Sequence, residues 1–215
     1  MIDRVHERQA KLLGFLCAVP LSRIGVALKP WLLNILACPI DKRHPLEARL
    51  FSWETPAEEM RKIASEAGVP SPYFRKGYGH LAKQLRDGTI SPAAMRTIED
   101  LTGSEDSARL LVDAVDAMGR LEQVLDRSEE ALLRDFPEDL DRLYRFLNLI
   151  EVDSGLLVCP ECGRWYPVGS AVESIPELLP DELRERDRDL AWLERWRERV
   201  PSHVLERGKP FNLSG

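Results

Sequence analysis

The sequence predicts an α+β fold, in which a small antiparallel, ribbon-like sheet is built from both ends of the chain around an inserted helical bundle. Two observations support this prediction. Short cysteine-containing turns occur at residues 38–41 and 159–162, and capped amphipathic segments fill the interval between them. A densely charged segment near the end predicts an amphipathic C-terminal helix. The expected parts are ribbon halves at 28–53 and 149–180, a helical insert at 54–148, and a charged helix and tail at 181–215.

The two turns share one pattern. Residues 159–163 read Cys-Pro-Glu-Cys-Gly, a complete zinc knuckle, and residues 38–41 read Cys-Pro-Ile-Asp, with aspartate at the second ligand position. A Cys-x-x-Cys turn directs two sulfurs at one ion, and two such turns complete a tetrahedral zinc site. Ordinary ribbons separate the turns by roughly 15–20 residues, whereas here residues 42–158 intervene. The sequence therefore predicts a zinc-ribbon-like sheet that is split by a subdomain.

The expected metal ligands are Cys38, Cys159 and Cys162, with Asp41 in the fourth position. Other interpretations stay open from the residues alone. The cysteines could form a disulfide or remain free thiols, and Asp41 could accept backbone amides and cap its turn. His44 is a displaced substitute ligand. Without a metal, Cys38 would pack as a small apolar residue.

Composition limits the class of protein. The 215 residues are 44% hydrophobic and 31% charged, which is typical of a soluble globular chain with a sizeable core. Four cysteines are too few for a disulfide scaffold, so we expect a reducing, cytoplasmic location. A formal charge of −6 argues against indiscriminate nucleic-acid binding. No apolar run reaches the roughly 18 residues that predict a membrane span.

Residues 1–27 form an extension of doubtful status. Lys11 to Leu21 follows basic residues and loosely resembles a signal peptide, but its apolar part is short and contains proline. We favour the interpretation that the start lies too far upstream and that the natural protein begins near Val26 or Leu28.

The first half of the chain gives these expectations. Trp31 to Leu36 is a short helix or a buried strand, and Pro45 to Trp53 alternates as a strand. Capping signals then predict four helices. The first helix starts at Thr55-Pro56 and ends at Gly68, and the second starts at Ser91-Pro92 and ends near Gly103. The third starts near Ser104 or Asp106 and reaches Leu125. The fourth starts at Pro137, with Leu140, Leu143, Tyr144 and Leu147 on its buried face.

The second half returns to strands. Residues 149–152 and 156–158 flank Asp153-Ser154-Gly155, which predicts a hairpin loop with glycine at a positive φ. Residues 165–168 form another short strand, with Trp165 expected in the core. From Asp181 to Arg199, apolar residues at helical spacing predict one long helix anchored by two tryptophans. These apolar residues are Leu183, Leu190, Leu193, Trp196 and Val200, and the tryptophan pair is Trp192 and Trp196.

Both ribbon halves carry a resemblance to a known family. The segments LLNILACPIDKRHPL (32–46) and GLLVCPECGRWYPVGSAVESIPELLPDELR (155–184) resemble the small activating subunit shared by tRNA-, rRNA- and release-factor-modifying methyltransferases, in its archaeal form. The resemblance covers about residues 28–53 and 149–185. It implies a non-catalytic protein that forms a heterodimer with an S-adenosylmethionine-dependent methyltransferase, covers an apolar patch on it, and keeps it soluble and active.

The residues themselves agree with a binding role. The four histidines have no paired nucleophile signature, and no glycine-rich phosphate loop occurs, so we expect no enzyme activity. Partner contacts are expected at Ile175, Leu178 and Leu179, in a proline-bounded segment too short to form its own sheet.

A nucleic-acid-binding zinc ribbon is the alternative function. Tyr73 to Arg86 is basic and aromatic, and five of its side chains could contact RNA. These are Arg75, Lys76, His80, Lys83 and Arg86. A solvated helix face is favoured because the whole chain is acidic, so any RNA contact is expected to be weak or indirect.

Overall fold

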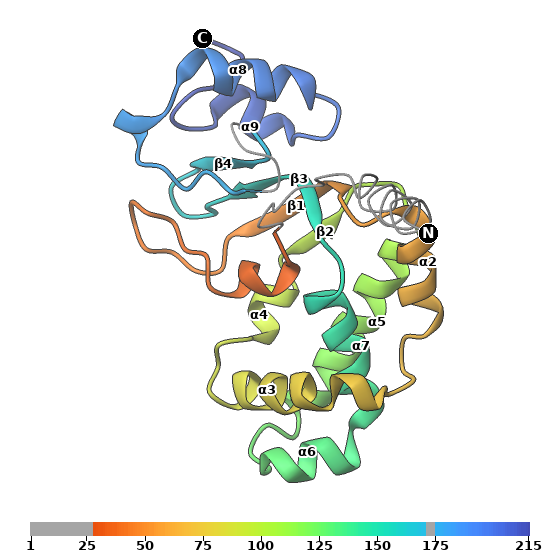
Figure 1. Ribbon diagram of the computed structural model, residues 1–215. Coiled ribbons are helices and arrows are strands. Elements are labelled where there is room, and N and C mark those ends of the chain that lie inside the picture. Colours follow the sequence, from red (N-terminus) through yellow and green to blue (C-terminus); the bar gives the residue numbers. More distant parts are fainter. Residues whose placement is uncertain (1–27, 171–174) are drawn as a thin grey trace, which may run out of the picture.

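The computed structural model describes residues 28–170 and 175–215. Within these residues the fold is α+β and contains a four-stranded sheet in the order β2-β1-β3-β4 (Figure 1). The strands are β1 (Glu47–Trp53), β2 (Ile98–Asp100), β3 (Val152–Val158) and β4 (Trp165–Val168). β1 and β4 run antiparallel to β3, but β2 runs parallel to β1, so the expectation of a purely antiparallel sheet was wrong.

β2 lies where the sequence predicted the end of a helix. The helix that opens at Ser91-Pro92 stops after one turn, as α4 (Pro92–Met95), and the chain then joins the edge of β1. The Thr97 hydroxyl donates to the carbonyls of Leu46 and Ala94, and the Ala48 amide donates to the Thr97 carbonyl. Pairing with an otherwise open strand edge satisfies backbone groups of β1, and this tertiary contact overrides the local helical pattern.

β3 is continuous through the predicted hairpin loop, so that prediction was also wrong. Gly155 lies opposite Leu50, and a Cβ added there would sit 2.7 Å from the Arg49 carbonyl oxygen. The glycine therefore serves close approach of two strands, and not a turn. The register of β1 shifts between Leu50 and Ser52, so Phe51 is a bulged residue.

The helical insert packs on one side of the sheet (Figure 1). It contains α2 (Ala57–Ser65), α3 (Arg75–Arg86), α5 (Glu105–Glu122), α6 (Glu129–Asp135) and α7 (Pro137–Asn148), together with the 3₁₀ turn η2 (Pro72–Phe74). The Ser104 cap of α5 is confirmed, because its hydroxyl accepts from the Ser107 amide. The capping box at Thr55 is wrong, since its hydroxyl accepts from the Glu151 amide and joins the insert to the sheet.

Apolar stripes fix how the insert meets the sheet. The predicted inner face of α7 is buried except for Tyr144, which is half-buried, and α5 presents a buried apolar stripe to the core. The buried members are Leu110, Ala114, Met118, Leu121, Leu140, Leu143 and Leu147. The segment before the first knuckle is the 3₁₀ helix η1 (Pro30–Asn34), which settles the choice between helix and strand.

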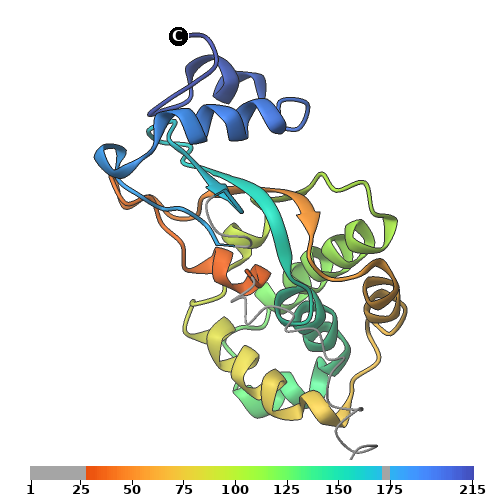
Figure 2. The ribbon, with the colours of Figure 1, turned by 45° about the horizontal axis from the view of Figure 1, so that its top comes forward.

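The C-terminal segment forms a module on the other side of the sheet (Figure 2). It consists of η3 (Asp181–Leu183), α8 (Arg186–Arg195) and α9 (Ser202–Arg207), so one long helix was wrong. Trp165, expected in the core, is fully buried and stacks on Trp192 at 5.9 Å. Leu183, expected on the buried stripe, is 60% exposed. None of the helices in the described residues is long and apolar enough to cross a membrane. The predictions for residues 1–27 lie outside the described residues.

Candidate metal centre

The two cysteine turns have the same backbone geometry. In the first, the Cys38 amide donates to the Arg43 carbonyl at 2.9 Å, and the Lys42 amide donates to the Cys38 carbonyl at 3.0 Å. In the second, the Cys159 amide donates to the carbonyl of residue 164 at 2.8 Å, and the amide of residue 163 donates to the Cys159 carbonyl at 3.0 Å. The two turns therefore have the same pattern of backbone hydrogen bonds, although 117 residues separate them.

The shared geometry places Asp41 where the second turn has Cys162. Each turn also needs a left-handed residue one position later, with φ of 72° at Gly163 and 62° at Lys42. Asp41 Oδ1 accepts from the Arg43 amide at 2.9 Å, and this hydrogen bond lowers the pKa of Asp41 to about 2. Asp41 thus caps its own turn and also faces the cysteines, so the two roles considered for it are combined.

The four expected ligands form one cluster. Their ligand atoms all lie within 4.8 Å of one another. The Cys38 and Cys162 sulfurs are 3.8 Å apart, and the Cys159 sulfur is 3.3 Å from Asp41 Oδ2. In a tetrahedral site with zinc–sulfur bonds of about 2.3 Å and zinc–oxygen bonds of about 2.1 Å, these separations are about 3.8 and about 3.6 Å. The donor set and spacing therefore fit zinc. His44 lies outside the cluster and its Nδ1 is 3.1 Å from the Leu36 carbonyl.

The cluster is largely shielded from solvent. Cys38 and Cys159 are completely buried, and all three cysteines of the cluster are free of disulfides. Burial raises the pKa of the Cys159 thiol to about 12, so at neutral pH a metal would displace its proton. The Tyr166 hydroxyl lies 3.1 Å from the Cys38 sulfur and supports the cluster from β4.

The expected partner segment lies along the edge of β4. The Gly169 amide donates to the Ile175 carbonyl at 3.2 Å, and the Glu177 amide donates to the Pro167 carbonyl at 2.9 Å. The segment thus extends the sheet instead of hanging free. Ile175 is 38% exposed, whereas Leu178 packs partly against the main core and Leu179 is half-buried.

Sequence reasoning missed two exposed apolar residues beside the first knuckle. Ile35 is 49% exposed and Ile40 is 43% exposed. Ile35 belongs to the apolar run at 31–36, which was expected as a short helix or a buried strand, and Ile40 lies inside the first cysteine turn. Together with Ile175 they are apolar side chains that the described part of the chain does not bury.

The helix that carries the alternative RNA surface has an ordinary amphipathic arrangement. On α3, Tyr78, Leu81 and Leu85 are buried, and the cationic residues face solvent. Arg86 pairs with Glu129 on α6 at 3.5 Å. This arrangement agrees with the solvated helix face that the acidic composition favoured.

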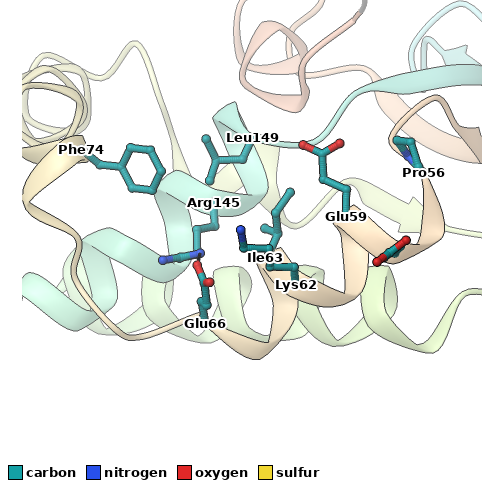
Figure 3. A pocket seen from close by; sticks show the side chains of 9 residues that line it. Pro56, Glu59, Lys62, Ile63, Glu66, Phe74, Arg145 and Leu149 are labelled. Carbon is teal, nitrogen blue, oxygen red and sulfur yellow. Dashed lines mark hydrogen bonds and ion pairs between the residues drawn. The ribbon is translucent and has the colours of Figure 1, made fainter.

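A cavity of about 600 Å³ lies between α2 and α7, and its lining includes Ile63, Phe74 and Leu149 (Figure 3). The guanidinium of Arg145 is held internally, by Asp141 at 2.8 Å and Glu66 at 3.0 Å. Among the described residues that line the cavity there is no serine, cysteine or histidine.

The fold brings two cysteine turns that are remote in sequence into one cluster that could hold a metal ion. A sequence model of the Trm112p-like protein family matches residues 29–169, which span both knuckles and the whole insert, and the chain belongs to this family. The family is known for non-catalytic partners that activate methyltransferases. No curated protein and no solved structure matches the chain. The C-terminal module at 181–215 lies outside the family match.

Proposed function

We propose that the protein is the non-catalytic subunit of a heterodimer with an S-adenosylmethionine-dependent methyltransferase, which it keeps soluble and active. The observation that carries this proposal is the family match over residues 29–169, which includes all four residues of the metal cluster. The substrates of the partner are tRNA, rRNA or a translation factor, and the complex works in the cytoplasm, in keeping with the free thiols of the cluster.

Zinc in this proposal has a structural role. Cys38 and Asp41 precede β1, and Cys159 and Cys162 follow β3, so one ion joins two parts of the chain that are remote in sequence. A closed structural site contributes directly to folding free energy. It also fixes the first knuckle, and with it the exposed side chains of Ile35 and Ile40.

The proposed partner surface consists of Ile175, Leu178 and Leu179, extended by the two isoleucines of the first knuckle. The strongest single candidate is Ile175, because it is exposed and its backbone is held by β4. Leu178 contributes partly to the core, so its substitution would change stability as well as binding. A few apolar anchors dominate the energy of a typical interface.

The test is capture of a methyltransferase from native extract of the source organism by the tagged full chain. Ile175→Glu should reduce capture ten-fold or more, since burying one such side chain is worth roughly 1.5–3 kcal/mol and about 1.4 kcal/mol is one decade. Val112→Glu is the matched control, because Val112 is 58% exposed on the helical insert. It should leave capture unchanged.

The possible failures are distinct. If the unaltered chain captures no methyltransferase, the proposed function is wrong. If Ile175→Glu and Val112→Glu capture it equally well, the function stands but the surface is misplaced. A steep salt dependence of RNA binding by the isolated chain would instead favour the nucleic-acid-binding alternative.

A further inference from the structure

A second cavity, of about 410 Å³, lies at the C-terminal end of β1. The helical insert, the sheet and the C-terminal module all contribute to its walls. Its lining residues are Phe51, Ser52, Trp53, Thr55, Ala57, Met60, Thr102, Ser104, Trp196 and Arg199. The metal cluster lies beyond the other end of β1, and a seven-residue strand is about 23 Å long at about 3.3 Å per residue. The cavity is therefore separate from the metal centre.

The bulge in β1 creates the aromatic walls. Phe51 packs in the core beneath the C-terminal module, and its ring centroid is 5.1 Å from that of Trp196. Trp53 packs instead against the main core, with its ring edge-to-face to Phe146 at 6.4 Å. Without the extra residue, side chains two positions apart would point to the same side of the sheet. The irregular strand end thus brings aromatic rings from both cores to one cavity.

Trp53 and Trp196 offer ring surface to the cavity. Their indole nitrogens are buried from solvent and make no hydrogen bond within the described residues, so these N–H groups do not face the open cavity. A small molecule in the cavity would therefore contact both residues through their aromatic rings.

The cavity also has a cation without an ion-pair partner. Arg199 donates one N–H to the Phe51 carbonyl, and its guanidinium lies 5.4 Å from the Trp196 ring centroid. No carboxylate in the described part of the chain lies within ion-pair distance of it. By contrast, Arg197, which lies two residues before Arg199 in the sequence, pairs with Glu194 at 2.9 Å. An arginine fork with free donors is well suited to a carboxylate or a similar planar anion.

We propose that this cavity binds a small aromatic acid, with its ring against Trp53 and Trp196 and its anionic group on Arg199. The volume falls in the range of small-molecule sites, about 300–1,000 Å³. Trp196 and Arg199 belong to the C-terminal module, outside the family match. The site is therefore a property of this chain beyond the family core, and it is independent of the proposed methyltransferase partnership.

The test uses two probes of equal shape and different charge. The full chain is titrated with 2-naphthoate and with the neutral 2-naphthamide, followed by tryptophan fluorescence and by saturation-transfer NMR of the ligand. Naphthoate should bind saturably at one site, and the amide at least ten-fold more weakly. Arg199→Met should lower naphthoate affinity ten-fold or more, and Trp196→Phe, which reduces the aromatic surface in the cavity, should lower it several-fold.

Arg197→Met is the matched control, because Arg197 is close in sequence but does not line the cavity. It should leave naphthoate affinity unchanged. Equal affinity for the acid and the amide, no saturable binding up to the solubility limit, or equal effects of Arg199→Met and Arg197→Met would each overturn the proposal. If Arg199→Met fails to fold, the comparison of naphthoate with naphthamide and the Trp196→Phe variant still test the proposal. Capture of the methyltransferase is measured separately, so the two proposals fail independently.

Discussion

Replacing Cys162 by serine separates the contribution of a metal from that of ordinary packing. Cys162 is only partly buried, and its sulfur lies 3.8 Å from the Cys38 sulfur, at ordinary non-bonded range. In a metal-free protein this near-isosteric change should cost about 1 kcal/mol or less. In a zinc-loaded protein it removes one of four ligands. The size of the effect therefore reports whether the cluster holds a metal.

The expected magnitude follows from linkage. A ligand present at 1,000 times its dissociation constant stabilises the native state by about 4 kcal/mol. For a domain of 150–250 residues, 1 kcal/mol moves Tm by about 2–4 °C, so zinc should raise Tm by about 8–16 °C over chelator. Cys162→Ser should lose most of this difference. Val112→Ser is the control, since Val112 is 58% exposed on the helical insert and lies outside the cluster, and it should keep the full zinc response.

The zinc response should also weaken as pH falls. Burial holds the pKa of the metal-free Cys159 thiol at about 12, so zinc binding at neutral pH releases its proton, and added protons compete with the metal. Asp41, with a pKa near 2, stays ionised over this range and does not add to the slope. Differential scanning fluorimetry with zinc or chelator at several pH values measures both effects. A Tm that chelator leaves unchanged, with identical behaviour of Cys162→Ser and Val112→Ser, would refute the metal centre.

Other substitutions test particular contacts by urea unfolding. Gly155→Ala should destabilise by about 1–3 kcal/mol because its Cβ would meet a backbone carbonyl, whereas Gly119→Ala, in open space within α5, should stabilise by about 0.5–1 kcal/mol. Lys42→Gly should stabilise by up to about 1 kcal/mol, since it relieves a positive φ; a loss of stability would contradict this account of the first knuckle. Asp189→Asn should cost about 3 kcal/mol, because it leaves the buried Arg184 charge uncompensated, and an effect below 1 kcal/mol would count against a strong pair.

The metal cluster and the class of fold could be predicted from sequence because both rest on local patterns. A cysteine turn carries its ligand geometry within five residues, so the proximity of Cys38 to Cys162 followed from pairing two such turns. The cap of α5 at Ser104 and the burial of its apolar stripe have the same local origin. Trp165 was placed correctly in the core because a large apolar residue next to a knuckle has few other places to go.

The errors occurred where a distant segment determines the local structure. Gly155 is flanked by turn-forming residues, and only the approach of β1 makes it part of a continuous strand. Thr97 and its neighbours read as helix until the free edge of β1 supplies hydrogen bonds. The small-molecule cavity could not be predicted either, since its lining comes from residues 51–60, 102–104 and 196–199. No local pattern connects these three segments.

The arrangement of the described residues leaves few places for a protein partner. The insert covers one side of the sheet, the C-terminal module covers the other, and residues 175–177 pair with the edge of β4. What stays apolar and accessible beside the sheet is the first knuckle, with Ile35 and Ile40, and the outer side of the segment at Ile175. The C-terminal module hides Phe51 and Trp165 on a face that the family core alone would leave in water. We therefore predict that a partner docks at the knuckle end and along residues 175–179.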